Sequence, residues 1–370
     1  YTTLALIALI AFGAWSAVWA AADPNGSATG GAADITAAKP GEPTPAEVLA
    51  QVGHNKVAIN MMWTLITGFI VMFMQAGFAI VESGLCRAKN SAHTMAMNFL
   101  IYPLGMLGFY VCGFAFMFGG LGAMGTLGGY AGLNKELGFH IGDKFFGLIG
   151  WKGFFLSGDS YDVAVFTLFL FQMVFMDTTA TIPTGAAAER WKFSSFTLYG
   201  CFVGSIIYPI FGNWVWGGGW LSQLGNMFKL GHGHVDFAGS SVVHLQGGVI
   251  ALIFAWLIGP RFGKYNKDGS INPLPAHNVP YVILGTFILA FCWFSFNAGS
   301  SLAGTDLRIA VAATNTMLAS ATAAMATTLY MWWFKTKKPD PTMMCNGMLA
   351  GLVAIRSEEH TSELQSPYVI

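Results

Sequence analysis

Charged residues are scarce in this chain: they make up 10% of its 370 residues, and 18 Lys and Arg balance 18 Asp and Glu. Ordinary soluble domains carry about 25% charged residues, so this chain has too few charged residues to cover the surface of a soluble protein. A formal net charge of zero argues against a nucleic-acid partner, because binding nucleic acid requires a cluster of basic residues on one face. Disorder is excluded because aromatic residues reach 15% and hydrophobic residues 54%. The composition predicts an integral membrane protein whose surroundings are the lipid bilayer.

Cysteines are few as well, and none of the five forms a CxxC pair or a spacing typical of a metal site. An odd number argues against a disulfide framework. The expected role of the cysteines is that of small apolar core residues, and we expect neither a metal nor a cofactor.

Long apolar runs are what the chain has in abundance. A helix that crosses the bilayer needs about 20 apolar residues. Seven runs meet this length, and an eighth begins near Met343 and stops at Ile355. The predicted fold class is an all-α polytopic membrane protein, with spans at 57–82, 92–119, 161–187, 194–216, 237–258, 279–299 and 309–334.

Basic residues are concentrated in alternate loops. They follow the first, third, fifth and seventh spans, whereas the other loops are poorer in Lys and Arg and longer, notably the Gly-rich segment 120–160. The positive-inside rule places the basic loops in the cytoplasm. We therefore expect a multi-pass protein of the cell (inner or plasma) membrane with its mature N-terminus outside.

The two ends of the chain differ from the rest. Residues 1–22 are an apolar run that ends in three alanines, which favours a signal peptide over a membrane helix. Residues 23–56, rich in Gly, Ala and Pro, are expected to be an exported linker. Residues 356–370 replace an apolar helix with polar sequence and resemble a translated sequencing-library adapter. We interpret 57–355 as the native membrane domain, C-terminally truncated, and 356–370 as a non-native tail.

Polar residues inside the predicted spans are the functional candidates, because such groups are costly in lipid. Asp236 stands where an N-cap of the fifth span is expected, a structural role that a fixed charge attracting cations would extend. His244 lies about 12 Å deeper and is either a packing residue or a proton-exchanging group. Asp177 is a further intramembrane acid for which the sequence offers no account.

Aromatic residues accompany these polar groups. Trp216 and three glycines end the fourth span, with Tyr208 two turns earlier; an interfacial aromatic belt also explains a Trp there. Triple glycine allows close backbone approach. Phe175 in the third span and the segment Phe296-Asn-Ala-Gly-Ser300 in the sixth add aromatic rings beside hydroxyl and amide groups.

Rival functions lack their motifs. The chain contains no HExxH, no GxxxxGK[ST] and no persuasive nucleophile–base spacing, so we expect no enzymatic activity. The potassium-channel filter sequence TVGYG is absent. His232 and His234 alternate with glycines and could bind a metal weakly, although an external loop explains them better.

In combination, several short motifs in order resemble the ammonium transporter family, the Amt branch of the Amt/Rhesus superfamily. The resemblance covers about residues 57–355. It is carried by Gly-Leu-Cys-Arg-Ala-Lys-Asn90, Ala-Ala-Ala-Glu-Arg190, Val-Trp-Gly-Gly-Gly219, Asp236-Phe-Ala-Gly with His244, and Phe296-Asn-Ala-Gly-Ser300.

The resemblance implies roles for these residues. Trp216, Ser300 and Phe175 would form an outer site that recruits NH4+, supported by Asp236 and Tyr208. The rings of Phe175 and Phe296 would be the pore gate, and His244 the first of two pore histidines that relay a proton. The second histidine would lie in a helix beyond residue 355.

The resemblance also implies an architecture and a function. The family has eleven spans in two inverted halves, of which about seven and a half are present here, and forms a homotrimer with one pore in each subunit. The chain would take part in nitrogen uptake, conducting NH3 with or without a separately moving proton and accepting methylammonium as an analogue. A PII-type regulator could bind the cytoplasmic loops. The alternative is an ammonium sensor of the same fold with little net transport.

Overall fold

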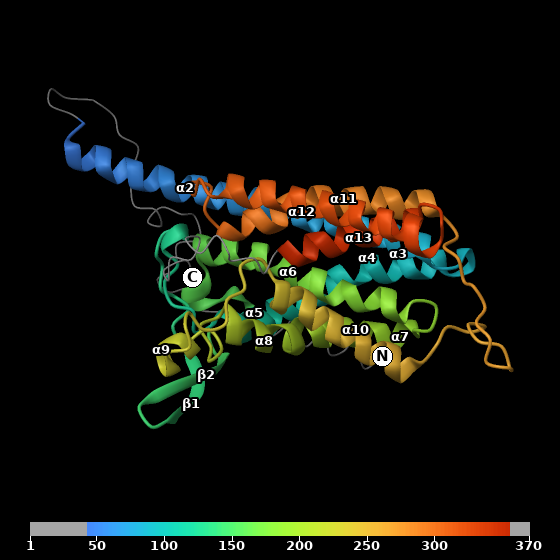
Figure 1. The fold of residues 1–370 in the computed structure, drawn as a ribbon. Helices are drawn as coiled ribbons and strands as arrows, with labels where there is room; N and C mark the ends of the chain where they lie inside the picture. Colours follow the sequence, from blue (N-terminus) through green and yellow to red (C-terminus); the bar gives the residue numbers. More distant parts are fainter. Residues whose placement is uncertain (1–42, 356–370) are drawn as a thin grey trace.

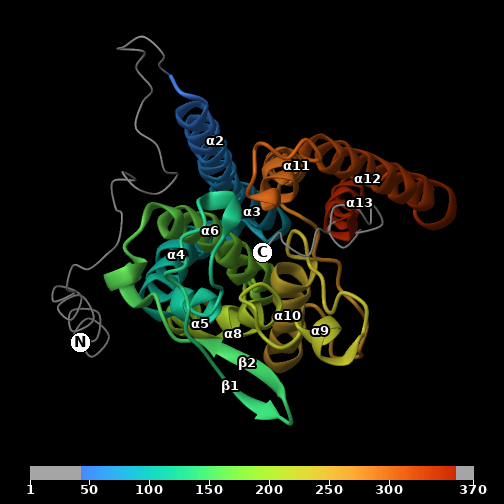
Figure 2. The same cartoon turned by 90° about the vertical axis from the view of Figure 1, so that its left-hand side faces the viewer.

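The apolar runs fold as helices because a segment inside lipid must satisfy its backbone N–H and C=O groups internally. The computed structural model describes residues 43–355, and within them seven helices are long and apolar enough to cross a membrane. Figure 1 shows these helices side by side along one direction, and Figure 2 looks onto one end of the bundle. The predicted all-α polytopic fold class is confirmed.

Most spans contain more than one helical segment. The first span joins α2 (Pro45–Met72) to α3 (Met74–Leu85), and the second contains η2 (Ala88–Asn90), α4 (Ser91–Gly108), η3 (Phe109–Gly113) and α5 (Phe114–Phe118). The third is α6 (Val163–Ala187), and the fourth contains α7 (Phe193–Phe202), η7 (Val203–Ile207) and α8 (Tyr208–Val215). The last three are η8 (Ser240–Leu245) with α10 (Gln246–Ile258), α11 (Val279–Ala298) with η9 (Gly299–Ser301), and α12 (Ile309–Tyr330) with η10 (Met331–Lys335). The shorter α13 (Pro341–Ala354) follows.

The first span begins earlier than its hydrophobicity predicts. Residues from Pro45 onward are helical, although composition places them in a linker that ends at 56. The reason is local: Thr44 and Glu47 form a capping box, and Pro45 occupies the first helical turn. Figure 1 shows α2 projecting beyond the other helices. The predicted signal peptide, the rest of the predicted linker before residue 43 and the predicted tail at 356–370 lie outside the described residues.

The Gly-rich segment 120–160 contains structure that the sequence did not indicate. The strands β1 (Glu136–Ile141) and β2 (Lys144–Gly150) form an antiparallel hairpin. The hairpin is attached to the end of the fourth span, because the Trp214 indole N–H donates to the Leu148 carbonyl oxygen at 3.0 Å. The short helix α9 (Leu224–Phe228) lies at the same end of the bundle in Figure 1, which we call the hairpin end.

The bundle is organised around α6. Within its most apolar stretch 83% of the residues are buried, compared with 11% for α12. Elsewhere close packing depends on small residues, as is typical of membrane helices. A Cβ atom at Gly285 of α11 would lie 2.7 Å from the backbone oxygen of Gly77 in α3, so these two helices touch backbone to backbone.

Three of the predicted cytoplasmic loops meet at the opposite end, which we call the basic-loop end. Glu189 accepts hydrogen bonds from the backbone N–H and the Nε of Arg87, each at 2.6 Å, and lies 3.7 Å from Arg261. Burial disfavours the ionised carboxyl, but the hydrogen bonds and charges of these arginines hold the pKa of Glu189 below its ordinary value. The loops after the first, third and fifth spans therefore share one side of the bundle; which side of the membrane this is stays a prediction.

Candidate functional site

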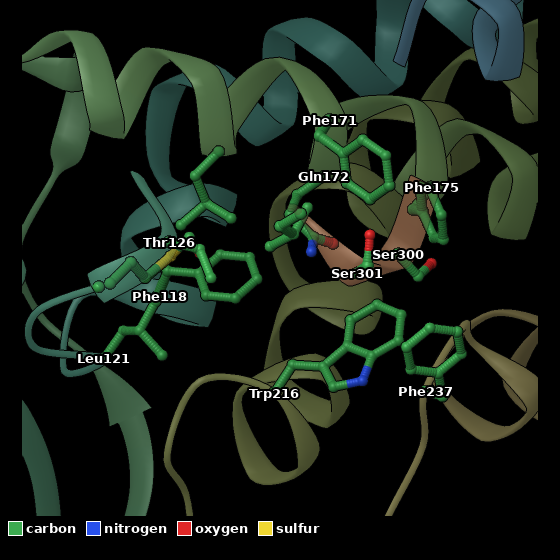
Figure 3. A pocket seen from close by; sticks show the side chains of 14 residues that line it. Phe118, Leu121, Thr126, Phe171, Gln172, Phe175, Trp216, Phe237, Ser300 and Ser301 are labelled. Carbon is green, nitrogen blue, oxygen red and sulfur yellow. The ribbon is translucent and has the colours of Figure 1, made fainter. Parts of the chain in front are cut away.

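A pocket opens at the hairpin end, where the second, third, fourth and sixth spans converge. It is a hollow of about 610 Å³, counting its open mouth. Figure 3 shows Trp216 and Phe237 on one side of it, Ser300 and Ser301 in the middle, and Phe171 and Phe175 on the other side. Its lining consists mostly of aromatic and aliphatic side chains with a few hydroxyl and amide groups. This composition suits a small ligand that is recognised by ring faces and by few hydrogen bonds.

Trp216 is held in place by its own backbone and by its indole nitrogen. It is the C-cap residue that directly follows the fourth span, is 5% exposed, and donates from Nε1 to the backbone oxygen of Asp236 at 2.6 Å. The glycines that follow permit this position: a Cβ atom at Gly217 would lie 1.8 Å from the Met117 backbone oxygen, and Gly218 has a φ of 85°. The close backbone approach expected of the triple glycine is present.

Ser300 contributes an acceptor to the pocket. Its hydroxyl donates to the backbone oxygen of Phe296 at 2.7 Å, so the hydroxyl proton is occupied within the sixth span. The oxygen lone pairs stay available to a donor in the pocket that Ser300 lines. A ligand bound beside Ser300 is therefore expected to be a hydrogen-bond donor.

Two phenylalanine rings separate the pocket from deeper regions. The ring centroids of Phe175 and Phe296 are 3.8 Å apart with an interplanar angle of 37°, and both side chains are almost fully buried. The ring centroids of Trp216 and Phe175 are 6.1 Å apart, and the two rings meet edge to face. The structure thus brings together the residues of the predicted outer site and of the predicted gate.

His244 does not line the pocket but lies next to the second of these rings. Its ring is 6.0 Å from Phe296 and 5.6 Å from Trp293, nearly parallel to the indole. It belongs to η8, a π-helical turn, and such turns are frequent at functional sites. Phe296 therefore contacts both Phe175, which lines the pocket, and His244.

Asp236 acts as a helix cap from an unexpected position. The fifth span begins at Ser240 with Gly239 as its N-cap, so Asp236 precedes the N-cap residue itself. Its carboxylate nevertheless accepts the backbone N–H groups of Gly239, Ser240, Ser241 and Val242 at 2.6–2.9 Å. The hydroxyls of Ser240 and Ser241 donate to it as well. The negative charge of Asp236 thus stabilises the N-terminus of the helical segment that contains His244.

Tyr208, a predicted site residue, and Asp177, for which the sequence offered no account, do not line the pocket. Tyr208 is fully buried against Phe109 and close enough to Asp236 for an electrostatic interaction, so it stands behind the site. Asp177 is 2% exposed and interacts with Tyr102 of α4 rather than with the gate. Among the described residues no hydrogen-bond partner reaches the Asp177 Oδ1 atom.

Some pocket residues escaped the sequence analysis. Gln172, Phe237 and Phe118 line the pocket, and the amide oxygen of Gln172 has no hydrogen-bond partner within residues 43–355. Gln172 precedes Phe175 by three residues, and this spacing puts both on one helix face. The spacing was therefore a usable signal for Gln172.

The histidines 232 and 234 are not gathered with other ligands. His234 has a ring nitrogen 2.8 Å from the Ser241 hydroxyl. No group of three or more His, Cys, Asp or Glu side chains that could hold a metal ion occurs in the described part of the chain.

Comparison with known proteins assigns the sequence to a family. The model of the Ammonium Transporter Family matches residues 62–370. The ammonium transporter Amt2 of Archaeoglobus fulgidus is 45% identical over 316 residues, covering 85% of this chain and 62% of the relative. The ammonium transporter Amt1 of Haloferax mediterranei is 38% identical over 323 residues, covering 82% of this chain and 57% of the relative. The chain thus spans about three fifths of the length of these relatives.

Solved structures are similar in fold. A structure titled Sensor Amt Protein has a TM-score of 0.69 and 35% identity, covering 84% of this chain and 72% of that one. The structure of Candida albicans Mep2 has a TM-score of 0.65 at 24% identity, covering 81% of this chain and 61% of that one, and shows the shared fold alone.

Proposed function

Because the chain belongs to the ammonium transporter family, we propose that it conducts ammonium or ammonia across a cell membrane. The observation that carries this proposal is the sequence of sites through the bundle: an aromatic pocket with a hydroxyl acceptor, a pair of phenylalanine rings, and a histidine beyond them. The named relatives support the substrate, since both curated relatives are called ammonium transporters.

The pocket suits a small cation that donates hydrogen bonds. A ring face of Trp216 or Phe175 attracts a cation with about 0.5–2 kcal/mol, and a charged hydrogen bond to Ser300 adds about 1.5–3 kcal/mol. Together these contacts supply a few kcal/mol. They are enough to recruit NH4+ in preference to a cation that cannot donate hydrogen bonds, such as K+.

The same energies argue against passage of an NH4+ ion that keeps its proton and loses its hydration shell. Moving an ammonium-sized ion into a low-dielectric medium costs on the order of 20 kcal/mol in the idealised Born estimate, far more than the recruitment contacts return. The phenylalanine pair offers no polar atom for the ion. We therefore propose that NH4+ is recruited outside, that it gives its proton to the imidazole of His244 at the gate, and that NH3 crosses the apolar stretch. His244 is the proton-relaying group that we assign to this region, because imidazole exchanges protons near neutral pH.

Further assignments follow from the family and belong to the same proposal. The chain is inserted with the hairpin end outside and the basic-loop end in the cytoplasm, after removal of a signal peptide. It assembles as a homotrimer with one pore in each subunit, and a PII-type protein regulates it from the cytoplasm. Residues 57–355 constitute its transport domain.

A sensor is the second candidate function, and one observation favours it. The solved structure with a TM-score of 0.69 is titled Sensor Amt Protein. A sensor would use the same outer pocket to bind ammonium, but the pore would pass little or none of it.

Reconstitution into liposomes tests the proposal and separates the two functions. The purified full-length protein is expected to support methylammonium uptake and ammonium-dependent currents well above those of empty liposomes. A preparation that binds ammonium but shows neither uptake nor current would refute transport and support the sensor. Trp256, which is 80% exposed on α10, supplies a matched control: W256L should behave as wild type, whereas W216L should not.

A further inference from the structure

A buried carboxyl group lies outside the pore, toward the basic-loop end. Glu82 is in the last turn of α3, is 9% exposed, and takes part in none of the ion pairs found among the described residues. Its neighbours Asn98 on α4 and Thr184 on α6 are fully buried. A lone carboxylate in such a place is costly, so Glu82 needs a cation or a proton to offset its charge.

The surrounding hydrogen bonds fix the position of nearly every neighbouring proton. Gln75 donates from Nε2 to the Asn98 backbone oxygen at 2.6 Å, so its amide oxygen is the acceptor for the Thr181 hydroxyl at 2.8 Å. Asn98 donates from Nδ2 to the Thr94 backbone oxygen at 3.1 Å and to Glu82 Oε2 at 2.7 Å. These contacts leave one hydroxyl whose direction is open.

That hydroxyl belongs to Thr184. Its oxygen lies 2.8 and 2.7 Å from the two carboxyl oxygens of Glu82 and 2.6 Å from the backbone oxygen of Thr181. Three acceptor atoms therefore surround a group that carries a single proton. One additional proton on Glu82 resolves the conflict, because the carboxyl then donates to Thr184 and Thr184 donates to the Thr181 carbonyl.

The two arrangements differ in their effect on α6. A threonine hydroxyl that bonds to a carbonyl one turn earlier tends to bend its helix. Pro183 lies in the same turn and has no N–H to offer the Thr179 carbonyl. The bend is thus placed where α6 is already weakened.

This turn of α6 packs against the helix that follows the histidine. A Cβ atom at Gly247 of α10 would lie 2.7 Å from the Ile182 Cδ1 atom and 3.2 Å from the Thr179 backbone oxygen. Gly247 follows His244 by three residues. A change in the bend of α6 therefore reaches the segment that carries the proposed pore histidine.

We propose that Glu82 is a proton-binding site inside the membrane, separate from the pore, and that its proton switches the Thr184 hydroxyl between the carboxylate and the Thr181 carbonyl. The proton comes from the basic-loop end, since Glu82 is only four residues, about 6 Å, from the end of α3 at Cys86. The consequence for transport rests on the proposed function: conduction depends on pH at the basic-loop end.

Other ionisable groups near Glu82 are few and are distinguishable from it. Tyr199 of α7 interacts with it electrostatically, but its hydroxyl donates to the Ala180 backbone oxygen at 2.9 Å. On α4 its hydrogen-bond partner is the uncharged Asn98, and the acid of α6, Asp177, is two turns away from Thr184. The charged or titratable groups at and near the helix ends include Cys86, Arg87, Lys89, His93, Glu189, Arg190, Arg261, His277 and Tyr281.

The test compares E82Q with wild type in liposomes while only the pH at the basic-loop end is varied. A glutamine accepts from Asn98 and donates to Thr184, so it reproduces the protonated arrangement and preserves the packing. Wild-type conduction should change about five-fold across the titration, the factor expected of one neutral hydrogen bond, and E82Q should abolish this change. Ratios of variant to wild-type rates cancel the effect of pH on the substrate.

Variants of Thr184 keep the proposal testable if E82Q does not fold. T184S retains the hydroxyl and should retain the pH response, whereas T184V should lose it. D177N removes the carboxyl buried within α6 and should leave the response unchanged.

A direct measurement of the proton does not require transport. One component of the infrared C=O band of protonated carboxyls should appear as pH falls, be missing from E82Q and persist in D177N and in E136Q. A band that is unchanged over the whole pH range, or an E82Q variant with the wild-type pH response, would overturn the proposal. If the band titrates while wild type conducts no ammonium, the proposed function fails and the proton site stands.

Discussion

The carboxylate of Asp236 offers a quantitative test of how the histidine-bearing span is held. Each of its oxygens has its own set of donors: Oδ1 accepts from Gly239 and Ser240, and Oδ2 accepts from Ser241 and Val242. In D236N one oxygen becomes an amide NH2, which donates and cannot accept. Whichever way the amide turns, two backbone N–H groups at the helix N-terminus lose their acceptor.

The cost follows from these contacts. A buried donor left without a partner costs about 1–3 kcal/mol, and the helix N-terminus also loses the favourable interaction of its dipole with a negative charge, about 0.3–1 kcal/mol. Two such donors and the dipole give a destabilisation on the order of 4 kcal/mol for D236N. By the same reasoning D236A should cost more than D236N, because alanine removes the acceptor of all four backbone N–H groups.

Thermal unfolding of the purified protein in detergent measures the effect. D236N should lower Tm by several degrees, and S240A, which removes only a 3.3 Å contact to the carboxylate, should change it little. A D236N variant with the Tm of wild type would refute the reasoning, since it would show that the helix N-terminus does not need both oxygens.

Three further predictions concern the pore and the hairpin. W216L should weaken the apparent affinity for ammonium by roughly two- to thirty-fold, the range of one cation–π contact, as measured by the substrate dependence of current. H244A should alter the transport rate or the selectivity for ammonium over other cations while the protein still reaches the membrane, as measured by methylammonium uptake and currents. Burial, opposed by a hydrogen bond from Asn213, raises the pKa of Glu136 from 4.5 to about 7; the folded hairpin therefore binds more protons than the unfolded chain between these values, and its stability should fall as pH rises through this window, as followed by hydrogen exchange of the β1 and β2 amides.

Controls and contrary results are available for each of these predictions. W256L, at an exposed position on α10, should leave affinity unchanged, and unaltered affinity in W216L would remove the indole from recruitment. H232Q, at an exposed histidine, controls for loss of an imidazole, and unchanged uptake and currents in H244A would remove His244 from the mechanism. E136Q should abolish the pH dependence of hairpin exchange; if the dependence persists in E136Q, another group is responsible.

The sequence predicted the helical spans well because hydrophobic length is a local property. It failed at the start of α2, where capping by Thr44 and Glu47 begins the helix at Pro45, within the predicted linker. It also missed the hairpin at 136–150, because short strands in a Gly-rich segment give no clear alternation of polar and apolar side chains.

The candidate site was predicted from motifs, and the structure shows which of its members meet. Trp216, Phe175 and Ser300 line one pocket, and Phe296 closes it from below with Phe175. Tyr208 was placed in the same group, yet it lies behind the pocket against Phe109. Distance along a helix axis can be read from sequence, but the side of the helix that faces a ligand depends on the neighbouring helices.

By itself, the sequence determined that this protein lives in a membrane, how often its described part crosses it, and which few polar residues are exceptional there. Those conclusions depend on composition and hydrophobic length, which each segment carries alone. The tertiary structure decided which polar groups share a proton. Glu82 ends an apolar run and Thr184 lies 102 residues later; they form one hydrogen-bonded site only because α3 and α6 pack together. Contacts of this kind depend on the relative rotation of helices, which no single segment specifies.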